Sequence, residues 1–134
     1  MDENGLFTLN SAHDFATTLE RLTAALAAKG ITLFACIDHA GGAAGVGLPL
    51  RPTTVVVFGN PAAGTPLMQA AQTVGIDLPL KALIWQGADG TVRLSYNDPA
   101  WIAARHQLGG ELQQAVAALA AGLSALARHA TGAP

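Results

Sequence analysis

The residues able to do chemistry are concentrated in a few short segments of a very apolar chain. They fall where predicted strands end and predicted helices begin, which is where binding and catalytic side chains are usually placed. These candidates are Asp38, His39, Arg51, Asn60, Thr65, Asp77, Lys81, Tyr96 and Asn97.

His39 is the candidate for proton transfer, because histidine exchanges its proton near neutral pH and serves as a general base or a metal ligand. Asp38 is its neighbour, but adjacent residues of an extended strand point to opposite faces, so a bond between them needs a bend at the strand end. The other three histidines are isolated, and no two lie at i, i+4. No metal site is therefore predicted, and the alternative to a catalytic His39 is a structural one.

Arg51 and Lys81 each begin a strand that should be buried. A cation there must be paired or must face a ligand. Paired with Asp38 or Asp77, the two cations would hold loops in place, whereas unpaired they would form a clamp for an anion. Tyr96 could donate a hydrogen bond to an oxygen of the same ligand.

The segment Gly59-Asn-Pro-Ala-Ala-Gly-Thr65 has the glycine spacing of a phosphate-binding loop. It lacks the lysine that reaches the terminal phosphates, which excludes nucleotide hydrolysis. Backbone N–H groups at the start of the following helix remain candidates for binding a carboxylate or phosphate, with Asn60 and Thr65 beside them. The alternative is a tight turn followed by a helix capped by Thr65. No cofactor signature is complete, so no cofactor is predicted.

Composition sets limits on the partners. Charged residues make up 12% and hydrophobic residues 51% of the 134 residues, so we expect apolar surface to be buried against another subunit. A net charge of −2 and scattered basic residues argue against nucleic-acid binding. The absence of a run of about 18 apolar residues predicts no membrane span. An acidic N-terminus and a lone Cys36 favour a cytoplasmic protein without disulfides.

Hydrophobic periodicity predicts a single α+β domain over residues 1–134. Its expected order is β-α-β-β-α-β-β-α-α, with a mainly antiparallel sheet of about five strands and helices on one face. The run 31–37 is apolar on both faces and is predicted to be a central strand with Cys36 in the core. The remaining expected strands are 5–10, 53–59, 80–86 and 91–97. The expected helices follow Ser11, Thr65 and either Asn97 or Asp98 as caps, with a last helix over 110–129.

Three long segments resemble the bacterial and archaeal family called domain of unknown function 302. They are IDHAGGAAGVGLPLRPTTVVVFGNPAAGTPLMQ, IDLPLKALIW and GTVRLSYNDPAWIAARH, within about residues 6–108. The resemblance implies a curved sheet with helices, similar to one repeat of the TATA-binding-protein fold, and pairing as dimers. It carries over no catalytic residue.

Three functions remain open. The first is a dimeric binding or sensing module for a small anionic or polar ligand, with Arg51, Asn60, Thr65, Lys81 and Tyr96 in its site. The second is an enzyme with His39 as general base. The third is a structural or interaction protein in which these polar groups are caps or buried pairs.

Overall fold

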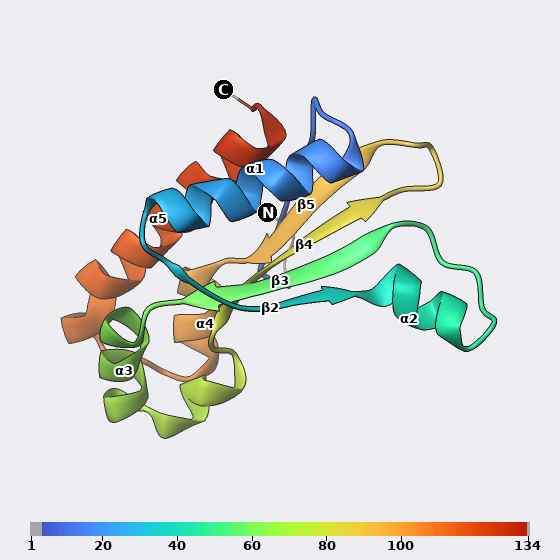
Figure 1. The fold of residues 1–134 in the computed structure, drawn as a ribbon. Helices are drawn as coiled ribbons and strands as arrows, with labels where there is room; N and C mark the ends of the chain where they lie inside the picture. Colours follow the sequence, from blue (N-terminus) through green and yellow to red (C-terminus); the bar gives the residue numbers. More distant parts are fainter. Residues whose placement is uncertain (1–3, 134) are drawn as a thin grey trace.

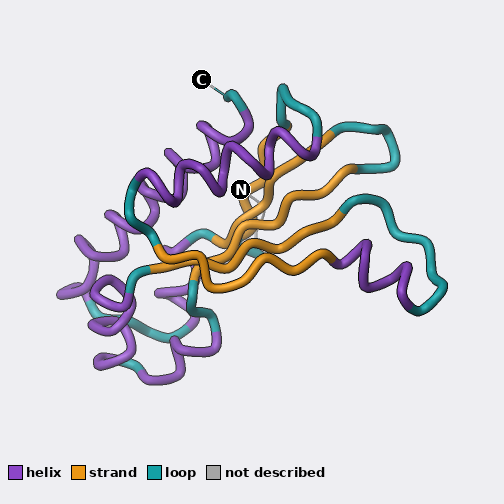
Figure 2. Tube along the Cα trace, in the orientation of Figure 1, coloured by secondary structure: helices purple, strands orange, loops and turns teal. Residues whose placement is uncertain are grey.

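The computed structural model describes residues 4–133, and these residues form one five-stranded antiparallel sheet (Figures 1 and 2). The strand order is β1-β5-β4-β3-β2, so β2 to β5 form a meander and β1 joins its far edge. The strands are β1 (Leu6–Asn10), β2 (Thr32–Asp38), β3 (Thr53–Gly59), β4 (Leu80–Gln86) and β5 (Val92–Asn97).

The helices cover one face of the sheet and one of its ends. Figure 1 shows α1 and α5 side by side over the sheet, with α3 and α4 at one end and α2 projecting from the opposite end. This arrangement confirms the predicted α+β fold. The helices are α1 (Phe15–Ala28), α2 (His39–Gly45), α3 (Pro61–Ala70), α4 (Pro99–Arg105) and α5 (Gln113–Thr131), with short 3-10 helices η1 (Gln72–Ile76) and η2 (Gly110–Leu112).

The core lies between the sheet and the pair α1–α5. Alternate residues of β3 and β4 point toward these helices, so that Val56, Phe58, Ala82 and Ile84 are buried. A second, smaller apolar cluster joins α3, η1, α4 and α5 at the end of the sheet, around Leu67, Val74, Ile102 and Val116. The residues between the buried ones on the strands therefore face the open side of the sheet.

Two helices begin at a different residue from the predicted one. Asp14, not Ser11, caps α1, and its carboxylate accepts a hydrogen bond from the Thr17 amide at 2.8 Å. The Asn60 side chain caps α3 by accepting from the Ala62 amide at 2.9 Å, so Thr65 lies inside the helix instead of at its start. Asn60-Pro61 and Thr65-Pro66 are both favourable cap-and-proline pairs, and the earlier one begins the helix.

Residues 39–45 form α2, although the expected element order has no helix between the second and third strands. The carboxylate of Asp38 accepts a hydrogen bond from the Gly41 amide at 2.9 Å and caps the start of this helix. None of the α2 residues is buried. The helix and the loop that follows it, together residues 39–51, therefore form an arm that extends away from the core (Figure 1).

Strand β2 lies at the edge of the sheet, so the prediction of a central strand was wrong. It pairs only with β3, with a register shift between Leu33 and Ala35. Its side chains are mostly exposed, including Cys36, which was expected in the core. An apolar pattern on both faces indicates that a strand should be covered, but it does not say which chain covers it.

Candidate functional site

The predicted site residues do not converge in one place within a single chain. His39, Lys81 and Asn97 lie around a hollow on the open face of the sheet. Asn60 and Thr65 lie at an apolar recess at the end of the sheet.

Arg51 lies at the end of the arm, away from both places. Tyr96 borders the hollow at its position on β5, but its side chain is buried in the core on the helix side. Each location therefore has to be judged by its own geometry.

The hollow on the open face, which we call the sheet hollow, has a volume of about 370 Å³. Its lining combines apolar and polar side chains, since Val55 and Leu83 lie beside the cation of Lys81 and the amide of Asn97. Lys81 reaches this face because its neighbour Ala82 points into the core.

Lys81 is the cation of the sheet hollow. Its ammonium group donates a hydrogen bond to the Pro79 carbonyl at 3.3 Å, and within residues 4–133 no carboxylate lies within 4 Å of it. The predicted pairing of Lys81 or Arg51 with Asp38 or Asp77 is therefore not formed in the described chain. An ammonium group with donors to spare is suited to an anionic ligand.

A polar network forms the floor of the sheet hollow. The buried Ser95 hydroxyl accepts a hydrogen bond from the Trp85 indole N–H at 2.9 Å and lies 2.8 Å from the Thr8 hydroxyl. This contact fixes the indole edge against β5. The guanidinium of Arg93 lies over the Trp85 ring, 5.2 Å from its centroid, and is paired with Asp89 at 2.8 Å.

His39 lines the sheet hollow but lacks a partner for base catalysis. The Asp38 carboxylate is occupied at the α2 cap, and in the described residues no hydrogen bond joins His39 to a carboxylate. A general base of this type is normally oriented by a hydrogen bond to its second ring nitrogen. The geometry therefore favours His39 as a ligand-contacting side chain over His39 as a base.

Tyr96 points away from the sheet hollow. Its ring stacks on Phe7 with centroids 5.3 Å apart and belongs to the same buried cluster as Leu123 and Leu126 of α5. Burial raises the pKa of the Tyr96 phenol above its ordinary value, an effect that the Ser124 hydrogen bond partly opposes. This tyrosine ties β5 to the helix layer.

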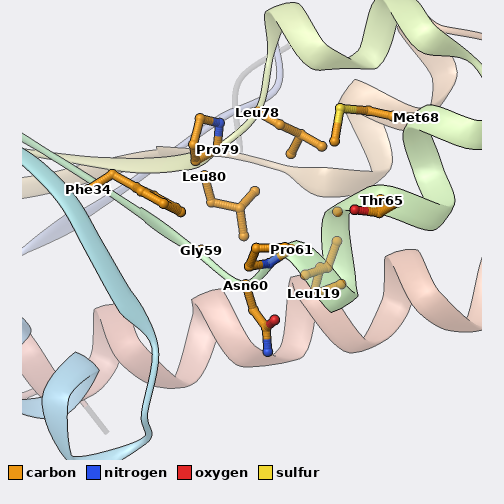
Figure 3. Close-up of a pocket in the computed structure, with 12 residues that line it drawn as sticks. Phe34, Gly59, Asn60, Pro61, Thr65, Met68, Leu78, Pro79, Leu80 and Leu119 are labelled. Atoms are coloured by element: carbon orange, nitrogen blue, oxygen red, sulfur yellow. The ribbon is translucent and has the colours of Figure 1, made fainter.

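The apolar recess is enclosed by Phe34 of β2, Pro61 and Met68 of α3, and Leu78 and Pro79 before β4 (Figure 3). Its volume is about 220 Å³, and Leu119 of α5 closes one side. In Figure 3 the Phe34 ring points into the recess from the edge strand, and Thr65 lies on the opposite wall. The recess is suited to apolar side chains instead of a charged ligand.

Asp77 belongs to a cluster that the sequence did not reveal. Its carboxylate accepts from Arg105 at 2.9 Å and lies 2.5 Å from His106 Nε2, while Thr73 Oγ1 lies 2.9 Å from His106 Nδ1. The His106 and Asp77 side chains are only 7% and 14% exposed. Because the partners come from η1 and α4, the cluster joins these two elements. A separation of 29 residues between Asp77 and His106 left no local signal for it.

Comparison with known proteins identifies the family. The model for the family described as "Domain of unknown function DUF302" matches residues 7–126. The chain belongs to the DUF302 family. The crystal structure of an uncharacterized conserved protein DUF302 from Bacillus stearothermophilus superposes with a TM-score of 0.83 at 20% identity, covering 94% of this chain and 98% of that chain. At this identity the likeness shows a shared fold.

This DUF302 chain is also similar to part of larger proteins. It is 43% identical over 130 residues to the fluoride-specific ion channel FluC 1 of Brucella suis biovar 1 (strain 1330), covering 97% of this chain and 51% of that protein. FluC 1 of Brucella abortus biovar 1 (strain 9-941) matches at the same identity over 48% of its length. The chain thus spans about half the length of these curated relatives. Within residues 4–133 of this chain, no helix is long and apolar enough to cross a membrane.

Proposed function

We propose that this DUF302 chain is a dimeric binding or sensing module for a small anionic or polar ligand, and that the ligand occupies the sheet hollow. The observation that carries the proposal is Lys81, a partly buried cation without a carboxylate within 4 Å in the described residues. Its ammonium group uses one donor on the Pro79 carbonyl and keeps further donors for an anion.

The neighbours of Lys81 supply the remaining contacts of the proposed site. Asn97 has an amide that both donates and accepts, and His39 supplies a ring nitrogen from the start of α2. The Ser95–Trp85 hydrogen bond fixes the wall on which the ligand rests. The ligand would therefore be held by one charge and two polar groups on a rigid sheet.

The relatives indicate which ligand to test first. Their matching halves belong to proteins named as fluoride-specific ion channels, so a small inorganic anion is the first class of probe. In this proposal the domain binds the anion, while transport belongs to the other half of those relatives.

The test compares melting temperatures in sodium fluoride and sodium chloride at equal ionic strength. A probe at a hundred times its dissociation constant stabilises the folded state by about 2.7 kcal/mol. At this chain length that corresponds to roughly 10 °C in melting temperature. We expect this shift in the wild type and its loss in Lys81→Gln.

Lys29→Gln is the matched control, because it removes the same charge from an exposed site at the end of α1. It should keep the full shift. Equal shifts in the wild type and Lys81→Gln with every anion, including phosphate and acetate, would refute the assignment of the sheet hollow.

A further inference from the structure

Strand β2 has an uncovered, uncharged edge. From Thr32 to Ile37 it carries no charged residue, and only its β3 side is paired. Leu33, Phe34 and Ile37 are 46%, 50% and 47% exposed. Edge strands of soluble proteins are normally protected by charges, proline or a covering element, because free backbone groups invite another strand.

The arm that follows β2 is equally uncovered. Val46, Leu48 and Leu50 are exposed, and most of the large exposed apolar side chains of the described chain lie between residues 33 and 50. The accessible surface is 7335 Å², whereas a monomer of 13.6 kDa is expected to have about 6,600 Å². The excess of roughly 700 Å² is close to the ~800 Å² that one partner buries in a standard interface.

We propose that β2 pairs antiparallel with β2 of a second copy, and that the exposed apolar side chains of each arm, Val46, Leu48 and Leu50, pack on the apolar recess of the other copy. This inference rests on the dimer of the proposed function and names its interface. It is independent of the ligand.

The two ends of β2 make the exchange geometrically complementary. The apolar recess lies at the end where Thr32 pairs with Gly59, and the arm leaves from the other end, at Asp38. In an antiparallel pair centred on Ala35, the middle of β2, Asp38 of one copy lies beside Thr32 of the other. Each arm then arrives at the recess of its partner, and both arms are buried by one two-fold axis.

The same arrangement explains two features that a single chain does not: the apolar pattern of β2 and the separation of the motif residues. It makes β2 a central strand of a ten-stranded sheet, as its apolar pattern predicts. It also brings Arg51 of one copy toward the end of the sheet where Asn60 and Thr65 of the other line the recess, while His39 stays at the sheet hollow of its own copy. Motif residues that are separated in one chain become neighbours across the interface.

The first test is sedimentation at micromolar concentration with two lysine variants. The wild type should sediment with about twice the mass of 13.6 kDa. Ile37→Lys should sediment as a folded monomer, because it places a charge on the edge in each copy. Ala16→Lys is the control, since Ala16 is exposed on α1, outside β2, the arm and the recess. A monomeric wild type would refute the dimer itself, whereas a dimeric Ile37→Lys would refute only this interface.

The second test fixes the register by cross-linking. In a Cys36→Ser background, Ala35→Cys places two thiols opposite each other with Cα atoms about 4.5–5.5 Å apart, within disulfide range. Mild oxidation should give a covalent dimer. Thr8→Cys, in the middle of the other edge strand, should remain monomeric on a denaturing gel. The reverse result would move the interface to β1.

The third test concerns the arm. In the same Cys36→Ser background, Leu48→Cys and Met68→Cys lie beyond opposite ends of β2, roughly 20 Å apart or more within one chain. A short bismaleimide should therefore join them only between copies and give a covalent dimer. A dimer that forms the Ala35→Cys disulfide but not this link would refute the packing of the arm on the recess.

Discussion

Asp77→Asn tests whether the Asp77 cluster is a structural tie or part of a site. The substitution keeps the shape of the side chain but removes the charge that His106 and Arg105 contact. A hydrogen bond to a charged group contributes about 1.5–3 kcal/mol when little exposed, as the Asp77–His106 contact is. The Arg105 side chain is 50% exposed, so its ion pair adds at most about 1 kcal/mol.

We therefore expect Asp77→Asn to lower the free energy of unfolding by about 2–3 kcal/mol, measured by urea denaturation. Arg105→Gln should cost less than about 1 kcal/mol. A double-mutant cycle of Asp77→Asn with His106→Gln should give a coupling of at least about 1 kcal/mol. Asp77→Asn within about 0.5 kcal/mol of the wild type would refute the structural role. Loss of anion binding in a variant of unchanged stability would instead place Asp77 in a site.

Three further outcomes follow from the packing. Gly5→Ala should destabilise by clearly more than Gly30→Ala in urea denaturation, because both have positive φ but a Cβ at Gly5 meets Trp101 at 2.3 Å and one at Gly30 meets nothing within 4 Å. Equal losses of unfolding free energy in the two variants would contradict the close approach of Trp101 to Gly5. Tyr96 is the sole tyrosine, so absorbance at alkaline pH should show a midpoint above 10.0, and the free energy of unfolding should fall as pH rises past 10.0, where the unfolded chain ionises first. Tyr96→Phe should remove this decline, and a wild-type midpoint at or below 10.0 would contradict the burial effect. Ile84→Val, at a fully buried position, should cost about 1 kcal/mol without changing the sedimentation of the protein.

Local sequence patterns predicted most elements because their signals lie within the elements. The Asp89-Gly90 turn and the alternation around it defined β4 and β5, and Asp98 with Pro99 defined the start of α4. The start of α3 was mispredicted because two cap-and-proline pairs compete there. A local pattern has no means of ranking them, whereas packing against the rest of the chain does.

The site was predicted less well because partners distant in sequence decide it. The position of Lys81 at the start of a strand predicted that it would be paired or would face a ligand, but it did not show whether a carboxylate would meet the ammonium group. Asp77 was assigned to cations near it in the motif, and it instead contacts Arg105 and His106 from α4. Chemistry-bearing residues can thus be recognised by type and position, while their pairing depends on the assembled fold.

The position of β1 sets the order in which the sheet can form. Strands β2 to β5 are neighbours in both sequence and sheet, so each of their pairings closes a much shorter loop than the β1–β5 pairing does. Strand β1 pairs with β5 across most of the chain, and its Thr8 meets Ser95 at a separation of 87 residues. Closing so long a loop is entropically costly, and no strand pairing offsets this cost until β5 is in place. The N-terminal strand is therefore the last to join the sheet during folding, and native-state hydrogen exchange should find its amides among the first to open.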